Sequence, residues 1–381
     1  MNSSDVLYDE ARTLLRSLCG PHGIRASASS TANYAAVFTR DAVMAGMAGL
    51  LLDDSTISDG LARTLDSLRG LQGSEGQIAS NYELVGGGSP RVSFGSGVPR
   101  LDAPLWYLLG ISVAARAGTL DPEPFRPSVR AVVRLLDAIE YNGRHLLYVP
   151  VGGDWADEYV YEGYILHDQV LRAWALRLAG ETFDEPAWGI KAARIEGAIE
   201  ERFWTADAIA RGYPVAAYSP ARVYEMFDLA SSSLLAVSGL APDIAAATLE
   251  WISHRFLVAG DLPPAFHPVI DDGHPDWPAL RRYHLHGFRN QPHEYHNGGI
   301  WPIWLGWLAL ALARHGRLAD LEHLRTVLVT RLASVERYGF EEFLHGLTGQ
   351  PGGTAQMAYS ATGLLFLHVA EMPERLALLT P

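Results

Sequence analysis

Two acidic segments of the chain carry side chains that could transfer protons. The segment GGDWADEYVYEGY contains Asp154, Asp157 and Glu158, and the segment YGFEEFLHGLTGQPGGTAQ contains Glu341 and Glu342. Hydrolysis of a glycosidic bond needs one carboxyl group to protonate the leaving oxygen and a second to activate the nucleophile. We therefore predict a catalytic pair with one member in each segment.

In the first segment, Asp157 is the predicted general acid. Its acidic neighbours Asp154 and Glu158 favour the protonated form that a general acid needs, because like charges repel. These two neighbours are also the alternative acids, and a turn held by Asp side chains is the structural alternative. Trp155 could supply an aromatic wall for the apolar face of a sugar ring.

In the second segment, Glu342 is the predicted general base. Glu341 is the alternative, since one of two adjacent glutamates usually faces solvent, and both could instead end the preceding helix. The Gly-rich stretch that follows lacks the spacing of a phosphate-binding loop. We interpret it as a loop over a cleft, in which Gln350 and Gln356 bind hydroxyl groups.

Polar clusters of this kind recur roughly every 60 residues, each just before an apolar stretch. They lie at residues 39–41, 100–102, 154–158, 224–228 and 294–297, and at Glu341 and Glu342 with the Gly-rich stretch that runs to Gln356. Asp and Asn are common helix N-caps, which could explain single members. Arginine is unfavourable at a helix N-terminus, so we predict that the clusters share a cleft. The residues predicted to hold a substrate there are Arg40, Asp41, Asp102, Trp155, His167, Glu294, His296, Asn297, Trp301 and Gln356.

The elements that must position these clusters are mostly helices, because apolar residues recur with the helical period. The predicted helices span 4–19, 41–52, 57–71, 103–117, 123–141, 164–179, 187–203, 228–238, 241–255, 299–315, 317–338 and 357–370, with one short strand at 145–151.

Helices of two kinds alternate along the chain. Those at 41–52, 103–117, 164–179, 299–315 and 357–370 are apolar on nearly all sides, which is typical of buried helices. The helices between them are amphipathic. This alternation predicts six hairpins, each with one inner and one outer helix, arranged in two concentric rings. The polar clusters would then all lie at one end of the ring. We predict a single domain over residues 1–381.

Composition narrows the function. The formal net charge of −13 provides no basic face for nucleic acid. One cysteine, Cys19, excludes an intramolecular disulfide and fits a reducing compartment. The N-terminal segment is typical of an amphipathic helix rather than a signal peptide. No run reaches about 18 uncharged apolar residues, so we expect no membrane span. We expect a cytoplasmic protein that binds a small carbohydrate. The composition does not decide whether the protein forms a homo-oligomer.

Four histidines make the densest titratable cluster. They are His284, His286, His293 and His296, with Glu294 among them. The spacing HLH…HEYH lacks a recognised zinc signature, so we predict no metal and no other cofactor. Histidines that titrate near neutral pH instead leave open an isomerase or epimerase of free sugars, and a sugar-binding scaffold without activity is a third alternative.

Several islands of the sequence resemble the neutral/alkaline invertase family. NYAAVFTRDAVMAGMAGLLL is similar to that family's VFxRDF helix start, RLDAPLWYLL to VDSGLWWIILL, and EYHNGGIWPIWLGW to YHNGGSWPxLLW. FEEFLHG followed by QMAYSATGLLFL is similar to WPEYYDG followed by QTWTIAG. The RDA start also resembles debranching domains of the amylo-α-1,6-glucosidase type.

The resemblance implies an (α/α)6 barrel and an inverting glycoside hydrolase without metal or organic cofactor. The base glutamate of WPEYYDG falls on Glu342, and the acid aspartate of the family's MIDRRMG segment falls on Asp157 across a small gap. The chain departs from the family's motifs at two places, with RDA in place of RDF and FEEFLH in place of WPEYYD. We therefore carry over the glycosidase chemistry from this family but not its specificity for sucrose. The expected substrate is a small α-linked sugar or α-glucoside.

Overall fold

The helices occupy two rings, one inside the other. The computed structural model describes residues 3–29, 34–83, 89–95, 97–140, 143–282 and 287–380. The inner helices are α2 (Thr39–Leu51), α4 (Asp102–Arg116), α6 (Leu166–Thr182), α9 (Leu229–Ser238), α12 (Pro302–Arg314) and α14 (Ala358–Val369). The outer helices are α1 (Ser3–Leu18), α3 (Ser55–Gly70), α5 (Arg126–Ala138), α7 (Pro186–Phe203), α10 (Pro242–Arg255) and α13 (Leu318–Ala333).

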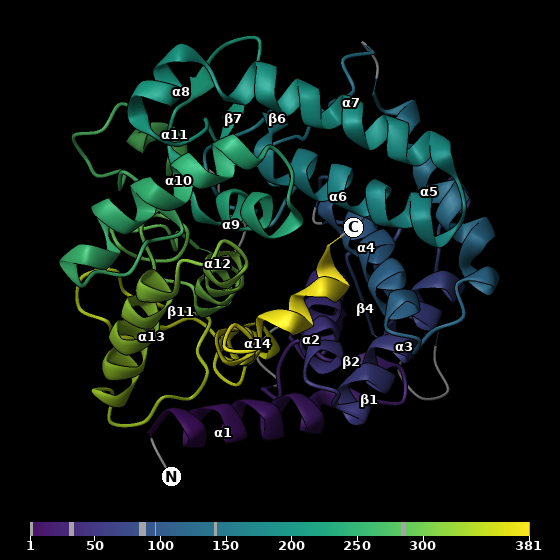
Figure 1. Ribbon diagram of the computed structural model, residues 1–381, viewed down its shortest axis with the longest axis horizontal. Coiled ribbons are helices and arrows are strands. Elements are labelled where there is room, and N and C mark those ends of the chain that lie inside the picture. The colour runs from purple at the N-terminus through teal and green to yellow at the C-terminus, as the bar shows by residue number, and fades with distance from the viewer. Residues whose placement is uncertain are drawn as a thin grey trace.

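Contacts between inner helices close the ring. Each packs against the next in chain order, and α14 packs against α2, so that the last inner helix lies beside the first (Figure 1). Each outer helix packs mainly on one inner helix, with α1 on α14 at the closure, and α3 also contacts α4. The predicted (α/α)6 barrel is thereby confirmed.

Burial follows the polarity that separates the two kinds of helix. Every residue of α12 from Pro302 to Ala313 is buried. In α5 the buried apolar residues, which include Val129, Val132 and Leu136, recur at helical spacing, and this pattern gives one face toward the core. Among the described residues, no helix is both long and apolar enough to cross a membrane.

All twelve predicted helices are present, with shifted ends. The helix expected at 299–315 begins at Pro302, because proline is favoured in the first helical turn. The helix expected at 123–141 divides into the 3-10 turn η1 (Glu123–Phe125) and α5. The short helices α8 (Ala206–Arg211) and α11 (Trp277–Leu280) and the 3-10 turns η2 (Leu257–Ala259) and η3 (Pro373–Leu379) were not predicted.

The predicted strand at 145–151 is wrong. Val149 makes an isolated bridge with Gly163, and the rest of the stretch pairs with nothing as a strand. Two features prevent an extended ladder: His145 has a left-handed φ of 66°, and Pro150 has no N–H to donate.

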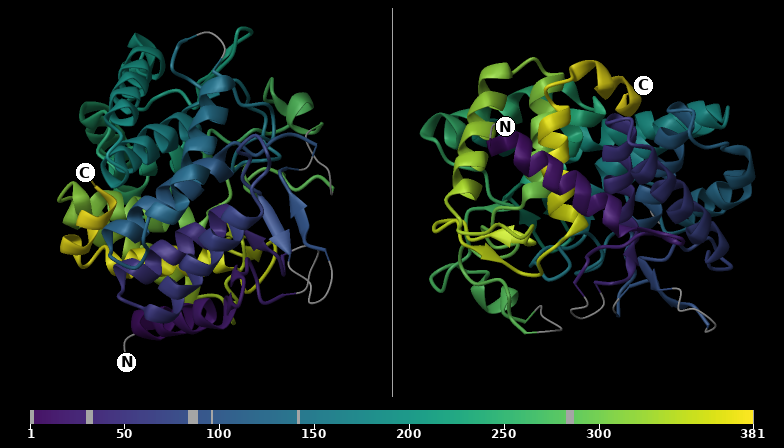
Figure 2. Two further views of the ribbon diagram at one scale, coloured as in Figure 1. Left: turned by 90° about the vertical axis from the view of Figure 1, so that its right-hand side faces the viewer. Right: turned by 90° about the horizontal axis from the view of Figure 1, so that it is seen from below.

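Short antiparallel strands lie where inner helices begin. Figure 2 shows these hairpins gathered at one end of the ring. They are β3 (Val37–Phe38), β4 (Asn81–Glu83), β5 (Arg91–Ser93), β6 (Tyr164–Ile165), β7 (Ala217–Tyr218), β8 (Val223–Tyr224), β9 (Phe227–Asp228), β10 (Phe266–His267), β11 (Phe343–Leu344) and β12 (Pro351–Gly352), with β1 (Cys19–Gly20) and β2 (Gly23–Ile24) beyond α1. Strands this short were below what sequence periodicity can detect.

Two glycines let α12 and α14 approach backbone to backbone. A Cβ at Gly363 would lie 2.1 Å from the Pro302 carbonyl oxygen, and one at Gly306 would lie 2.4 Å from the Gly363 oxygen. We expect Gly363→Ala to destabilise the fold by about 1–3 kcal/mol, since overpacking forces backbone shifts. The measurement is urea unfolding.

Gly197 on the exposed side of α7 is the matched control, because a Cβ there meets no atom within 4 Å. Gly197→Ala should stabilise the protein by about 0.5–1 kcal/mol through lower chain entropy. Equal effects of the two substitutions would contradict the close helix contact.

Candidate active site

A cavity of about 80 Å³ opens at the end of the ring where the inner helices begin. Arg40 and Asp41 start α2, Trp301 precedes the first residue of α12, and Met357 precedes that of α14. The cavity is lined by Tyr34, Phe38, Arg40, Asp41, Trp155, Asp157, Arg289, Tyr295, His296, Trp301, Glu342, Met357 and Tyr359. A pocket of this size suits a single small polar ligand rather than a chain of sugars.

The structure brings both predicted catalytic carboxyls into this pocket, together with five predicted substrate ligands. These seven residues are Asp157, Glu342, Arg40, Asp41, Trp155, His296 and Trp301. They come from four segments far apart in the sequence. Closure of the ring therefore assembles the site.

Six other predicted ligands do not line the pocket, and one of them, Gln350, is exposed. Asp102 lies behind it and binds Arg40. Asn297 is buried, and its side chain binds the backbone of Ile270 and Asn290. Glu294 is half-buried outside the pocket, and His167 is fully buried behind it. Gln356 has a left-handed φ of 56° and is exposed on the groove between α1 and residues 335–340.

Glu342 is held by strand pairing. It immediately precedes β11, where Leu344 exchanges two backbone hydrogen bonds of 2.8 Å with Ile300. Gly346 donates to the His293 oxygen at 2.8 Å, and a Cβ on Gly346 would lie 2.3 Å from the Gly298 oxygen. The absence of a side chain at Gly346 thus allows the segment that carries Glu342 to pack on the HNGG loop that carries His296.

Glu342 is buried, with 5% of the residue exposed. It accepts a hydrogen bond of 3.1 Å from the Tyr34 hydroxyl and one of 3.4 Å from the Thr354 N–H. Burial raises its pKa to about 7, and the charge of Asp157 adds to this, while Arg289 and the two donors oppose it. Such a group changes protonation near neutral pH, which suits a general base.

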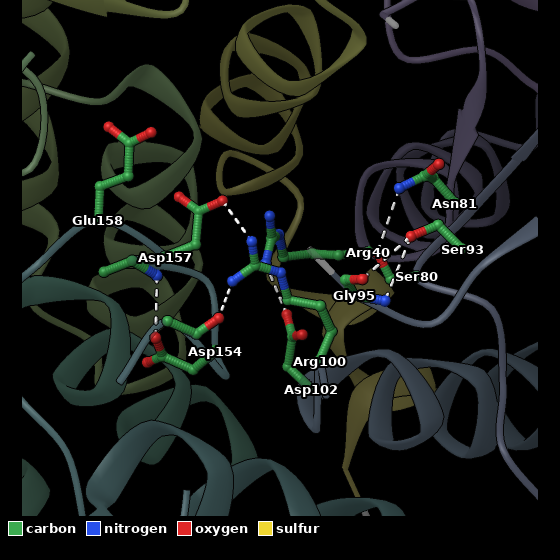
Figure 3. Close-up of polar contacts among 12 residues, drawn as sticks. Arg40, Ser80, Asn81, Ser93, Gly95, Arg100, Asp102, Asp154, Asp157 and Glu158 are labelled. Atoms are coloured by element: carbon green, nitrogen blue, oxygen red, sulfur yellow. Dashed lines mark hydrogen bonds and ion pairs between the residues drawn. The ribbon is translucent and has the colours of Figure 1, made fainter. Parts of the chain in front are cut away.

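Asp157 lies on a loop pinched at its base by the bridge between Val149 and Gly163. Its carboxylate accepts a hydrogen bond of 2.7 Å from Arg100 Nη2, and its side chain is 32% exposed. The other guanidinium nitrogen of Arg100 binds the Gly152 carbonyl oxygen. Figure 3 shows Asp157 directed toward Arg100, with Glu158 pointing away from it.

The alternative acidic residues have other partners. Burial raises the pKa of Asp154 to about 8, and this carboxyl accepts hydrogen bonds from the Tyr161 hydroxyl and the Ala156 N–H. Glu158 accepts two hydrogen bonds from Arg289, of 2.9 and 3.1 Å. Glu341 accepts from the Gly339 N–H at 2.9 Å. Asp154, Glu158 and Glu341 do not line the pocket.

The Arg40–Asp41 pair begins α2 at the pocket wall. Arg40 Nη1 donates to Asp102 at 2.6 Å, and its Nε lies 3.8 Å from Asp41. Burial raises the pKa of Asp41 to about 6, although Arg40 opposes the shift. Neither Asp41 nor Asp102 is an N-cap; Asp228 is, since its side chain accepts from the Ala230 N–H before α9.

Several pocket residues carry buried polar atoms without a hydrogen-bond partner among the described residues. These atoms are Arg40 Nε, Trp155 Nε1, His296 Nδ1 and Tyr359 Oη. Buried polar atoms normally have a hydrogen-bond partner, and a ligand rich in hydroxyl groups would supply the missing partners. Trp155 stacks edge-on against Trp301 and His296, and these rings add the apolar surface that sugars require.

Some lining residues were missed by sequence reasoning. Tyr295 lies in a cluster that was recognised, but Tyr34, Phe38, Arg289 and Tyr359 lie outside any cluster. Arg289 is held over the Tyr295 ring at 4.1 Å and paired with Glu158. A pairing between residues 131 positions apart leaves no local signal in a single sequence.

Comparison with known proteins decides the family. Residues 129–362 match the mannosylglycerate hydrolase MGH1-like glycoside hydrolase domain, and this range is more than half of the 381-residue chain. The chain belongs to this family. The matched range contains both Asp157 and Glu342. The resemblance to invertases is therefore confirmed at the level of a glycoside hydrolase with a helical barrel, and the matching family is a different one.

Solved structures share the fold of this glycoside hydrolase. The GH63 mannosylglycerate hydrolase of Thermus thermophilus, solved with glucose, has 16% identity and a TM-score of 0.71, covering 94% of this chain and 99% of that one. A rhamnosidase of Klebsiella oxytoca with rhamnose bound has 12% identity and a TM-score of 0.65, covering 96% of this chain and 63% of that one. A wild-type glycosidase has 16% identity and a TM-score of 0.61, covering 100% and 98%. No curated protein matches the chain.

The histidine cluster does not assemble in the pocket. Among the described residues, His296 is the one histidine that lines it, and burial lowers its pKa well below the usual range. His293 lies outside the pocket, and His284 and His286 lie outside the described residues. An isomerase that transfers protons through histidines would need two of them facing each other in the cleft, with Glu342 outside it. Glu342 instead lines the pocket.

Proposed function

We propose that this glycoside hydrolase cleaves a small α-linked sugar or α-glucoside with inversion at the anomeric carbon. The observation that carries the proposal is the presence of Asp157 and Glu342 in one pocket. Two carboxyl groups facing one bound sugar are what an inverting hydrolase requires. We further propose that residues 1–381 act as a single catalytic domain.

In the proposed mechanism, Asp157 protonates the glycosidic oxygen as the bond to the anomeric carbon breaks. Glu342 removes a proton from a water molecule, which attacks the same carbon from the opposite face. Asp157 becomes a carboxylate, and Arg100 at 2.7 Å stabilises the charge that it gains. Arg40, Asp41, Trp155, His296 and Trp301 would hold the sugar.

The small enclosed pocket favours removal of a single terminal sugar. Its unpartnered donors, such as Trp155 Nε1 and Arg40 Nε, would bind hydroxyl groups of that sugar. Because the matching family is named for mannosylglycerate, and one of the Thermus structures contains D-glycerate, glycerate glycosides belong among the substrates to test.

A substrate screen tests the proposal directly. The panel is α-glucosides, α-mannosides, glucosylglycerate and mannosylglycerate, with the anomer of the first-formed sugar followed by NMR. A β-anomer released from an α-glycoside supports inversion. An α-anomer would contradict it, and interconversion of free sugars without hydrolysis would favour the isomerase.

The pH profile provides a second test. A general base acts when ionised, so kcat/KM should fall about tenfold per pH unit below the pKa of Glu342, which burial raises to about 7. Tyr34→Phe removes a hydrogen bond that favours the carboxylate. We therefore expect Tyr34→Phe to move the acidic limb to higher pH.

Tyr161→Phe is the matched control, because Tyr161 donates to Asp154 and does not line the pocket. It should leave the acidic limb in place. A limb that moves to lower pH in Tyr34→Phe, or by the same amount in both variants, would remove Glu342 as the titrating base.

A further inference from the structure

A second group of titratable side chains lies behind the pocket. Asp154, His167 and Asp168 each place one donor atom within 4.8 Å of the others. His167 and Asp168 belong to the first turn of α6, and Asp154 comes from the loop that also carries Asp157. None of the three lines the pocket. Two aromatic rings lie between, since Trp155 packs on Trp304 and Trp304 contacts the His167 ring.

The polar atoms of this group are buried and incompletely paired. Asp154 is 1% exposed, and His167 and Asp168 are fully buried. Both ring nitrogens of His167 and both carboxylate oxygens of Asp168 have no hydrogen-bond partner in the described part of the chain. His167 Nδ1 and Asp168 Oδ2 lie 3.7 Å apart. Buried groups left in this way are costly, so the arrangement calls for a ligand.

The charges point to a cation. Among the described residues, no arginine or lysine pairs with Asp154 or Asp168. The nearby Asp102 is paired with Arg40, and Asp228 is bound by Ser231. Without a cation, burial favours the protonated, neutral forms of Asp154 and Asp168 by raising the pKa of both carboxyls. A bound divalent ion would stabilise both groups as carboxylates and neutralise their charge.

We propose that Asp154, His167 and Asp168 bind a divalent first-row metal ion such as Zn²⁺ or Mn²⁺. An imidazole nitrogen with two carboxylate oxygens suits such ions better than Ca²⁺ or Mg²⁺, which favour oxygen ligands throughout. Two ligand atoms that each lie about 2.1 Å from one ion can be at most about 4.2 Å apart. The donor atoms here lie within 4.8 Å of one another, so movements of about half an ångström would bring all three within bonding distance of the ion.

The surroundings of Asp154 support the assignment. Its carboxyl is already oriented by the Tyr161 hydroxyl and the Ala156 N–H, and metal ligands are usually fixed by such outer partners. The ion would fasten the loop of Asp157 to α6. Its role is structural, distinct from the proton transfers in the pocket, and this assignment differs from the expectation of a protein without metal.

Metal content tests the proposal without reference to activity. The protein is expressed and refolded with ZnCl₂, dialysed, and analysed by elemental mass spectrometry. We expect about one Zn²⁺ per chain and a lower Tm after removal of the metal by a chelator. Co²⁺ in place of Zn²⁺ should give visible absorption bands of a nitrogen- and oxygen-ligated ion.

Variants locate the ion. Asp168→Asn and His167→Gln should each lose the bound Zn²⁺ and the effect of the chelator on Tm. Asp228→Asn is the matched control, because it alters a buried carboxyl at the start of α9 and asparagine also caps helices. Wild-type protein with less than about 0.1 Zn²⁺ and Mn²⁺ per chain after refolding with either ion, or equal metal content in Asp168→Asn and wild type, would overturn the proposal.

Discussion

Glu342→Gln is expected to lower kcat by about 10²- to 10⁴-fold with little change in KM, because the amide cannot take a proton from the attacking water. The fold should survive, since the amide oxygen can still accept from the Thr354 N–H while the amide NH2 donates to the Tyr34 hydroxyl oxygen. The measurements are kcat and KM on the best substrate of the panel, with a thermal melt for the fold.

Glu341→Gln is the matched control for this variant. Glu341 is adjacent in sequence, has the same chemistry, and accepts from the Gly339 N–H outside the pocket. Its kcat should stay within about twofold of wild type. A Glu342→Gln enzyme with wild-type activity would remove the proposed base, and absence of hydrolysis in every form, wild type included, would favour a sugar-binding scaffold.

Asp157→Asn is expected to lose about 10²- to 10⁴-fold in kcat on alkyl glycosides, whose leaving oxygen needs a proton. On glycosyl fluorides, which depart with little help, the loss should be much smaller. This dependence on the leaving group identifies a proton donor, whereas a residue that merely positions the substrate affects both kinds alike. Stopped assays on matched methyl glycosides and fluorides measure it.

The alternative acids provide the contrast. Glu158→Gln weakens the ion pair with Arg289. Asp154→Asn alters the group of Asp154, His167 and Asp168 behind the pocket. We expect either variant to lower the rates on both substrate types by similar factors. If Glu158→Gln shows the dependence on leaving group and Asp157→Asn does not, the acid is Glu158.

Helices were predictable from the sequence because the signal for them is local. An apolar surface on all sides, as in Pro302–Ala313, requires burial wherever the helix lies. Alternation with amphipathic helices then predicts two rings. Short strands and the turn at residues 145–151 were not predictable, because pairing over two or three residues leaves no periodic pattern.

The sequence by itself determined the barrel, the end at which polar residues gather, and the two segments that supply carboxyl groups. Tertiary structure decided which members of those segments face the pocket. In one loop, Asp154 turns to Tyr161 and Glu158 to Arg289, whereas Asp157 lines the pocket and turns to Arg100. Adjacent side chains diverge because their partners come from elsewhere in the chain, as Tyr34 does for Glu342 from 308 positions away. Those contacts exist once the ring has closed, and local residue types do not encode them.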